Sequence, residues 1–244
     1  MNELLFYLAN KVKGDSFLIF KEIAKSTEIS RKELMELHNK YMQAGVKYFT
    51  LFSNCYPDVL NLLKYPPYVI FYKGNVNLLN SKKIYYLINE QNNPQANSWF
   101  KSNIDTLVNN SVLFTNDYDS EADIVSYFRS HNGKIIHIAK SGLNTLDYSD
   151  INFENELFIS QYPLDAHPKR FYFKEANLIA ACISNSLISF SCNENSKVFN
   201  LINYFVDLGK DINCFPGSLP NDGNNSLIKS GANLITMISE VLNV

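Results

Sequence analysis

The chain has 244 residues, of which 46% are hydrophobic and 19% charged, so its composition is that of a globular protein and excludes a disordered chain. Its net charge of −2 and its pI of about 6.1 exclude the strongly basic character typical of dedicated nucleic-acid binders. Any nucleic-acid site would therefore have to be a local patch.

The N-terminal segment is predicted to be helical. Its apolar residues recur at helical spacing from the first turn onward. Ser30, with Glu33 three positions later, has the form of a capping box, and Gly45 is typical of a helix C-cap. We therefore expect a small helical module over residues 1–51.

Residues 52–244 alternate between short apolar strands and helices. Strands are expected at 68–72, 84–88, 112–115, 134–139, 157–160, 187–191 and 211–215. Helices are expected at 94–108, 120–130, 173–183, 196–208, 224–230 and 236–242. Strands that are apolar on both faces and separated by helices indicate a parallel sheet covered on two sides. The sequence thus predicts an α/β fold with a Rossmann-like, doubly wound, mostly parallel sheet.

The cysteines and the N-terminus bear on the cellular compartment. The four cysteines lie far apart in the sequence and form no Cys-x-x-Cys pair: Cys55, Cys182, Cys192 and Cys214. They are expected to be small buried hydrophobes in a reducing environment. We expect no signal peptide, because Glu3 precedes the first apolar run and no small-residue cleavage site follows it. No apolar run is long enough to span a membrane. A cytoplasmic location is predicted.

Motifs for catalysis, metal binding and dinucleotide binding are absent from the sequence. The histidines lack metal-ligand spacing: His38, His131, His137 and His167. The turns after the first two strands of the wound sheet, 89–94 and 116–119, contain acidic residues and no glycine. Such turns repel phosphate and exclude the usual dinucleotide loop. We therefore expect a ligand-binding protein rather than an enzyme, with no cofactor and no metal.

Residues 167–174, with the sequence HPKRFYFK, interleave cations with aromatic rings. This mixture suits backbone phosphates together with stacked bases. The alternative is a solvated basic loop above a hydrophobic anchor. Gly217 follows the last predicted strand of the sheet, where its backbone N–H could approach an anion or could simply form a turn.

Five sequence motifs resemble those of the DNA-processing protein A family, called DprA or Smf. YPPYVIFYKGN at 65–75 is similar to the family's PP-x-x-L-F-x-x-G-N, and YPDVL at 56–60 to its YP-x-x-L. SQYP at 160–163 resembles its S-E-Y-P, and PGS at 216–218 matches its PGS. GNNSLIKSGA at 223–232 agrees with G-x-N-x-L-I-x-x-G-A at every fixed position. The order and spacing agree from about Tyr56 to the end of the chain.

The resemblance implies a function as well as a fold. Members of this family bind single-stranded DNA through an extended Rossmann-like domain, form dimers, and help to load the recombinase RecA during natural transformation or recombination. They are not known as enzymes. The resemblance therefore implies an extended Rossmann-like domain over 52–244, a homodimer, and single-stranded DNA and RecA as partners.

The sequence also departs from the family's pattern. Asn89-Glu90-Gln91 stands where the family has Gly-Ser-Arg, and 117–123 replaces its G-x-A-x-G-I-D-x-x-A-H helix start. Residues 172–177 occupy the place of F-P-x-R-N-R without either arginine, and 196–201 replace S-G-S-L-I-T. No winged helix is expected, because the chain stops at Val244. Each lost arginine removes a charge-assisted phosphate contact, so much of the family's DNA pocket is predicted to be missing.

Three hypotheses follow. The first is a divergent, sequence-tolerant binder of single-stranded DNA. Its predicted site residues are Lys169, Arg170, Tyr172, Phe173, Lys174, Lys197, Gly217, Ser218 and Asn225. The second is a protein-interaction module that has lost DNA binding, which the acidic early turns favour. The third, a small-nucleotide binder or hydrolase, is disfavoured by the absence of glycine loops.

Overall fold

The computed structural model describes residues 1–25, 29–91, 93–219 and 222–242. The chain divides into two compact units. Unit 1 comprises Met1–Asn80 and Ile138–Lys174, and unit 2 comprises Ser81–His137 and Glu175–Val244. Both units are built from two separate stretches of the chain. This division differs from the boundary expected at residue 51, because residues 138–174 from the second half of the chain belong to unit 1.

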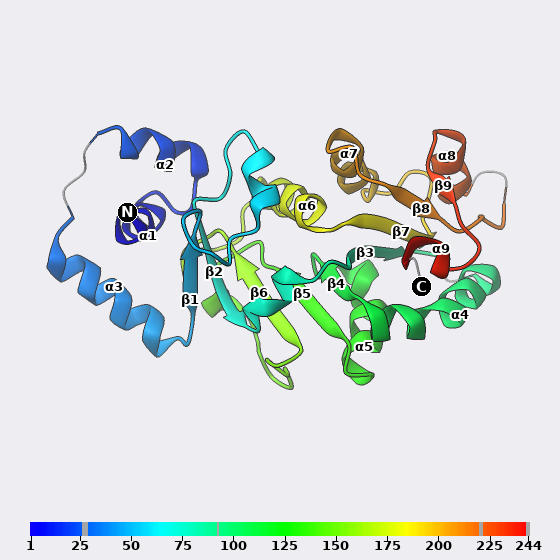
Figure 1. The fold of residues 1–244 in the computed structure, drawn as a ribbon, viewed down its shortest axis with the longest axis horizontal. Coiled ribbons are helices and arrows are strands. Elements are labelled where there is room, and N and C mark those ends of the chain that lie inside the picture. The colour runs from blue at the N-terminus through cyan, green and yellow to red at the C-terminus, as the bar shows by residue number, and fades with distance from the viewer. Residues whose placement is uncertain (26–28, 92, 220–221, 243–244) are drawn as a thin grey trace. The chain divides into compact units, whose positions relative to one another are not determined.

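Unit 1 combines three helices with a small antiparallel sheet (Figure 1). Its helices are α1 (Asn2–Lys11), α2 (Ser16–Ile23) and α3 (Arg31–Gln43). Its strands are β1 (Lys47–Thr50), β2 (Val69–Gly74) and β6 (Glu156–Ser160). Short 3-10 helices are η1 (Asp58–Leu62), η2 (Val76–Asn80) and η4 (Leu143–Thr145). The strand β2 lies between β1 and β6 and is antiparallel to both.

The prediction that residues 1–51 are entirely helical is wrong at β1. Gly45 has φ +64° and, as predicted, ends α3, so the chain reverses there. The next residues pair with β2, with Tyr48 opposite Phe71. Phe49 and Thr50 are buried by this pairing. The residues of β1, KYFT, do not form an apolar run, and the strand with which they pair lies outside the segment, so no local pattern identified this strand.

Unit 2 contains a parallel sheet with helices on both faces (Figure 1). Its strands are β3 (Ile84–Asn89), β4 (Val112–Thr115), β5 (Lys134–Ile138), β7 (Ser186–Ser191), β8 (Ile212–Cys214) and β9 (Asn233–Leu234). Its helices are α4 (Pro94–Asn110), η3 (Asp119–Glu121), α5 (Ala122–Ser130), α6 (Tyr172–Ile183), α7 (Phe199–Asp207), α8 (Gly223–Lys229) and α9 (Ser239–Leu242). The first three residues of α6 belong to unit 1. The predicted elements are confirmed with ends that differ by at most three residues; β9 was not predicted.

The strand order of unit 2 is β5-β4-β3-β7-β8-β9. The chain therefore winds from β3 to β5 in one direction and from β7 to β9 in the other. This confirms the doubly wound, mostly parallel sheet. The order reverses between the neighbours β3 and β7, so the loops at their carboxyl ends form the switch point where ligands bind in such sheets. Among the described residues, no helix combines the length and the apolar character needed to cross a bilayer.

Candidate functional site

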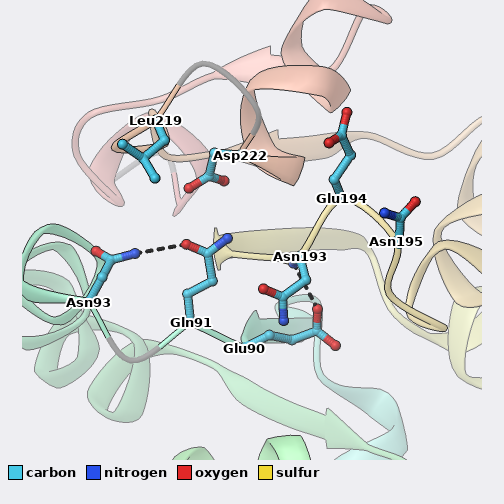
Figure 2. Close-up of a pocket in the computed structure, with 8 residues that line it drawn as sticks. All are labelled: Glu90, Gln91, Asn93, Asn193, Glu194, Asn195, Leu219 and Asp222. Carbon is cyan, nitrogen blue, oxygen red and sulfur yellow. Dashed lines mark hydrogen bonds between the residues drawn. The ribbon is translucent and has the colours of Figure 1, made fainter.

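A pocket of about 650 Å³ lies at the switch point of unit 2 (Figure 2). Its walls come from the loop after β3, the loop after β7, and the segment before α8. The lining residues are Glu90, Gln91, Asn93, Asn193, Glu194, Asn195, Leu219 and Asp222. The pocket therefore stands where the fold predicts a ligand, and its lining is almost wholly polar.

Hydrogen bonds hold the two strand-end loops together. The Glu90 carboxylate accepts from the backbone N–H of Asn193 (3.0 Å) and from the Ser196 hydroxyl (2.5 Å). Gln91 donates its side-chain N–H to the Cys192 carbonyl (2.8 Å). Glu90, which the motif resemblance places at the position of a serine, joins the two loops through these hydrogen bonds. The donors to its carboxylate, a backbone N–H and a hydroxyl, are both uncharged.

Tight packing explains two glycines of the C-terminal motifs, Gly217 and Gly223. A Cβ on Gly217 would lie 2.3 Å from Cγ of Asp222, and a Cβ on Gly223 would lie 2.6 Å from Sγ of Cys192. The Gly217 N–H donates to Oδ1 of Asn225 (3.1 Å). This bond favours the turn interpretation of Gly217, because the N–H offered for an anion is already used within the chain.

The electrostatics of the pocket oppose phosphate binding. Three carboxylates line it, those of Glu90, Glu194 and Asp222, together with four side-chain amides. No lysine or arginine is among its lining residues. A second strand end is also acidic, since Asp117 follows β4. The described residues hold no group of three or more His, Cys, Asp or Glu side chains suited to a metal ion. The pocket therefore suits a neutral or cationic ligand.

The carboxyl end of β4 is filled by a buried polar network that sequence reasoning missed. The Glu121 carboxylate accepts from the Tyr86 hydroxyl, from the Thr115 hydroxyl (2.5 Å) and from the backbone N–H of Asn116 (3.0 Å). The Asn116 amide donates to Oδ1 of Asn177 (3.1 Å). Burial raises the pKa of Glu121 to about 7. The sequence predicts an acidic turn at 116–119 and a helix from residue 120, and it assigns no role to Glu121; only burial distinguishes Glu121 from its acidic neighbours.

The basic aromatic segment 167–174 lies in unit 1 and is exposed over most of its length. Lys169, Arg170 and Lys174 are all exposed cations. Phe171 is 46% exposed and Phe173 is 40% exposed. Nζ of Lys169 lies 5.8 Å from the centre of the Phe171 ring. Cations and ring faces are therefore presented side by side on one short stretch of surface.

Tyr172 anchors this segment. It is 2% exposed, and its ring stacks on that of Tyr162 at 3.5 Å and 20°. The Phe171 ring meets it edge-on at 4.6 Å. Tyr172 was predicted as a contact residue for DNA, but a buried, stacked ring offers no face to a base. Phe171, which was not among the predicted site residues, is exposed instead. The alternation of residues along the segment was the signal that could have identified it.

The predicted site residues fall into the two units. Those of the 167–174 segment lie in unit 1; Lys197, Gly217, Ser218 and Asn225 lie in unit 2. Lys197 and Ser218 are exposed, while Gly217 and Asn225 are half-buried. The Ser218 hydroxyl donates to Oδ1 of Asn93 (3.2 Å), and Asn225 donates to the Leu219 carbonyl (2.7 Å). The polar groups of Ser218 and Asn225 thus already bond within the chain.

The family model for DNA recombination-mediator protein A matches residues 119–244, just over half of the chain. The chain belongs to the DNA recombination-mediator protein A family. DNA processing protein DprA of Streptococcus pneumoniae is 26% identical over 206 residues, which cover 80% of this chain and 72% of that protein. Protein Smf of Escherichia coli is 23% identical over 202 residues, and the match spans 78% of this chain and 54% of Smf.

Solved structures of the DprA family have the same fold. The crystal structure of DNA processing protein A from S. pneumoniae superposes with a TM-score of 0.74 at 23% identity, covering 93% of this chain and 81% of that one. DNA processing protein A from Helicobacter pylori, studied for its single-stranded DNA binding mode, gives a TM-score of 0.69 at 20% identity, covering 82% and 96%. The Rossmann-like DprA fold expected from the five motifs is therefore confirmed.

Proposed function

We propose that this DprA-family chain binds single-stranded DNA without strong sequence preference, through the 167–174 segment of unit 1. Family membership supports a role in DNA processing. The observation that carries the choice of surface is the exposure of three cations and two aromatic rings on eight consecutive residues. Cations neutralise phosphates, and ring faces stack on any base, so such a surface is sequence-tolerant.

The switch-point pocket is not part of the proposed DNA-binding surface. The pocket lacks a lining cation and contains three carboxylates, which repel phosphate. Lys197, although exposed, belongs to unit 2 and is not required by this proposal. We also propose the finer roles that the family suggests: assistance to a RecA-type recombinase, a homodimer, a cytoplasmic location, and binding without catalysis.

A titration of fluorescent oligo-dT at low and at physiological salt tests the proposal. The variant Lys169→Glu/Arg170→Glu/Lys174→Glu is expected to lose binding at both salt concentrations. The matched control, Lys32→Glu/Lys101→Glu/Lys229→Glu, changes the net charge equally at exposed positions and is expected to bind as the native chain does. Equal weakening in both triple variants would show a non-specific charge effect and contradict the proposal.

A second candidate function is favoured by the acidic pocket. Carboxylates and amide oxygens suit the guanidinium or ammonium group of a partner protein's side chain. This corresponds to the protein-interaction hypothesis. It would be supported if an arginine-rich peptide bound the native chain and not a Glu194→Lys variant, while oligo-dT bound neither. Tight oligo-dT binding that depends on Lys169 and Arg170 would leave it unsupported.

A further inference from the structure

A second exposed aromatic cluster lies on unit 1, outside the 167–174 segment. Phe17 and Phe20 project from α2, and Tyr65 follows η1 in the chain. These rings are 40%, 54% and 39% exposed, respectively. The Tyr65 ring lies edge-on to Phe17 at 5.1 Å and tilted against Phe20 at 6.3 Å. Three large rings thus share one solvent-facing surface, which we call the α2 patch.

Lysines cover the rings of the α2 patch. Nζ of Lys21 lies 4.3 Å from the centre of the Phe17 ring, and Nζ of Lys64 lies 5.5 Å from that of Tyr65. An ammonium group over a ring face is a weak cation–π contact at an exposed site, and a base can displace it at little cost. The displaced ammonium group is then well placed for the phosphate of the same nucleotide.

The acidic groups of α2 are already occupied. The Glu22 carboxylate pairs with Lys11 (3.0 Å) and Lys25 (2.5 Å). The Asp15 carboxylate caps the helix by accepting from the backbone N–H of Leu18 (2.9 Å). The Glu22 carboxylate is therefore neutralised by lysines, and Lys21 and Lys64 place two cations on the rings. The patch is complementary to a polyanion that carries flat apolar groups.

We propose that the α2 patch is a second contact surface for single-stranded DNA, on which Phe17, Phe20 and Tyr65 stack bases while Lys21 and Lys64 meet phosphates. The inference rests on the proposed function and extends it: a strand held by 167–174 would gain a second, independent contact on unit 1. Exposed rings flanked by lysines are the composition used for sequence-tolerant binding of single strands.

Two variants of the whole 244-residue chain separate the stacking and charge contributions. Phe20→Ser/Tyr65→Ser removes ring faces, and Lys21→Glu/Lys64→Glu reverses charge; each is expected to weaken binding of a long oligo-dT by about tenfold. The control Val206→Ser/Met237→Ser removes two exposed apolar side chains of unit 2 and is expected to leave binding unchanged. Irradiation of a 5-bromodeoxyuridine strand bound to the native protein is expected to crosslink to Phe17, Phe20 or Tyr65.

The outcomes distinguish this inference from the proposed function. Crosslinks confined to 167–174, with both α2-patch variants binding normally, would overturn the inference and leave the proposed function intact. Absence of oligo-dT binding by the native chain at low salt would overturn both. A changed oligomeric state in the Phe20→Ser/Tyr65→Ser variant, with unchanged DNA affinity, would assign the patch to an interface between copies and overturn the inference.

Discussion

At the scale of single residues, the buried carboxylate of Glu121 has the largest effect on pH dependence that we expect in unit 2. Its three hydrogen-bond donors are all uncharged: Tyr86, Thr115 and the Asn116 backbone. Donors of this kind compensate the cost of burying a charge only in part, so burial still raises its pKa to about 7 from an ordinary value of 4.5. The folded chain therefore keeps a proton on Glu121 at pH values where the unfolded chain has released it.

The sign of the resulting pH dependence follows from proton uptake. Between pH 4.5 and 7 the folded state binds more protons at Glu121 than the unfolded state, so stability falls as the pH rises through this window. Above pH 7, the titration of Glu121 lowers the free energy of unfolding by roughly 3 kcal/mol relative to its value at low pH. Chemical denaturation at pH 5 and pH 8 should show it as a lower free energy of unfolding at pH 8.

Substitution of this residue provides the control. In Glu121→Gln the side chain no longer titrates, so the difference in free energy of unfolding between pH 5 and pH 8 is expected to shrink by most of that amount. An unchanged pH dependence in the variant would show that other groups cause it.

At the scale of elements, the end of β2 depends on one glycine. Gly74 has φ +106°, a backbone conformation that is strained for residues with a side chain. A Cβ at this position would also lie 2.1 Å from the Glu156 carbonyl oxygen. The pairing of Gly74 with Leu157 brings the two backbones this close. Packing between β2 and β6 therefore requires the glycine at position 74 of the motif 65–75.

Two alanine substitutions separate packing from backbone strain. Gly74→Ala is expected to destabilise the chain by more than about 3 kcal/mol, because it adds a backbone overlap to the strained conformation. Gly45→Ala shares a positive φ but has no atom within 4 Å of the new Cβ, so it should cost only about 1 kcal/mol. Denaturant midpoints measure both; equal losses would mean that conformation alone requires Gly74.

At the scale of the whole molecule, the net charge of −2 means that DNA affinity must come from a local surface. The 167–174 segment supplies three cations, Lys169, Arg170 and Lys174. If each neutralises one phosphate of a single strand, the logarithm of the binding constant should fall with the logarithm of salt concentration with a slope of about −2. The α2 patch, with two more lysines, would steepen this slope.

This slope can be measured by repeating the oligo-dT titration at several salt concentrations. Short strands that reach only the 167–174 segment should give the slope of about −2, and long strands a steeper one. The Lys169→Glu/Arg170→Glu/Lys174→Glu variant should give a slope near zero on short strands. A steep slope on short strands that persists in this variant would place the phosphate contacts elsewhere.

The sequence by itself determined the parallel sheet, most element boundaries and the family. Apolar runs such as 84–88 and 112–115 are buried on both faces, and this pattern is local enough to be recognised. The sequence also identified the acidic turn at Glu90 and the interleaved cations and rings of 167–174, because charge and residue type can be taken directly from the sequence.

Only the tertiary structure decided which of these side chains are exposed and able to contact a ligand. Burial separates Tyr172 from Phe171 and Glu121 from Asp119, although each pair is close in sequence. Strand pairing with β2 converts a predicted helical end into β1, and the neighbouring ends of β3 and β7 turn scattered polar residues into a pocket. These outcomes depend on contacts between residues far apart in the chain, and a local sequence pattern carries no information about such contacts.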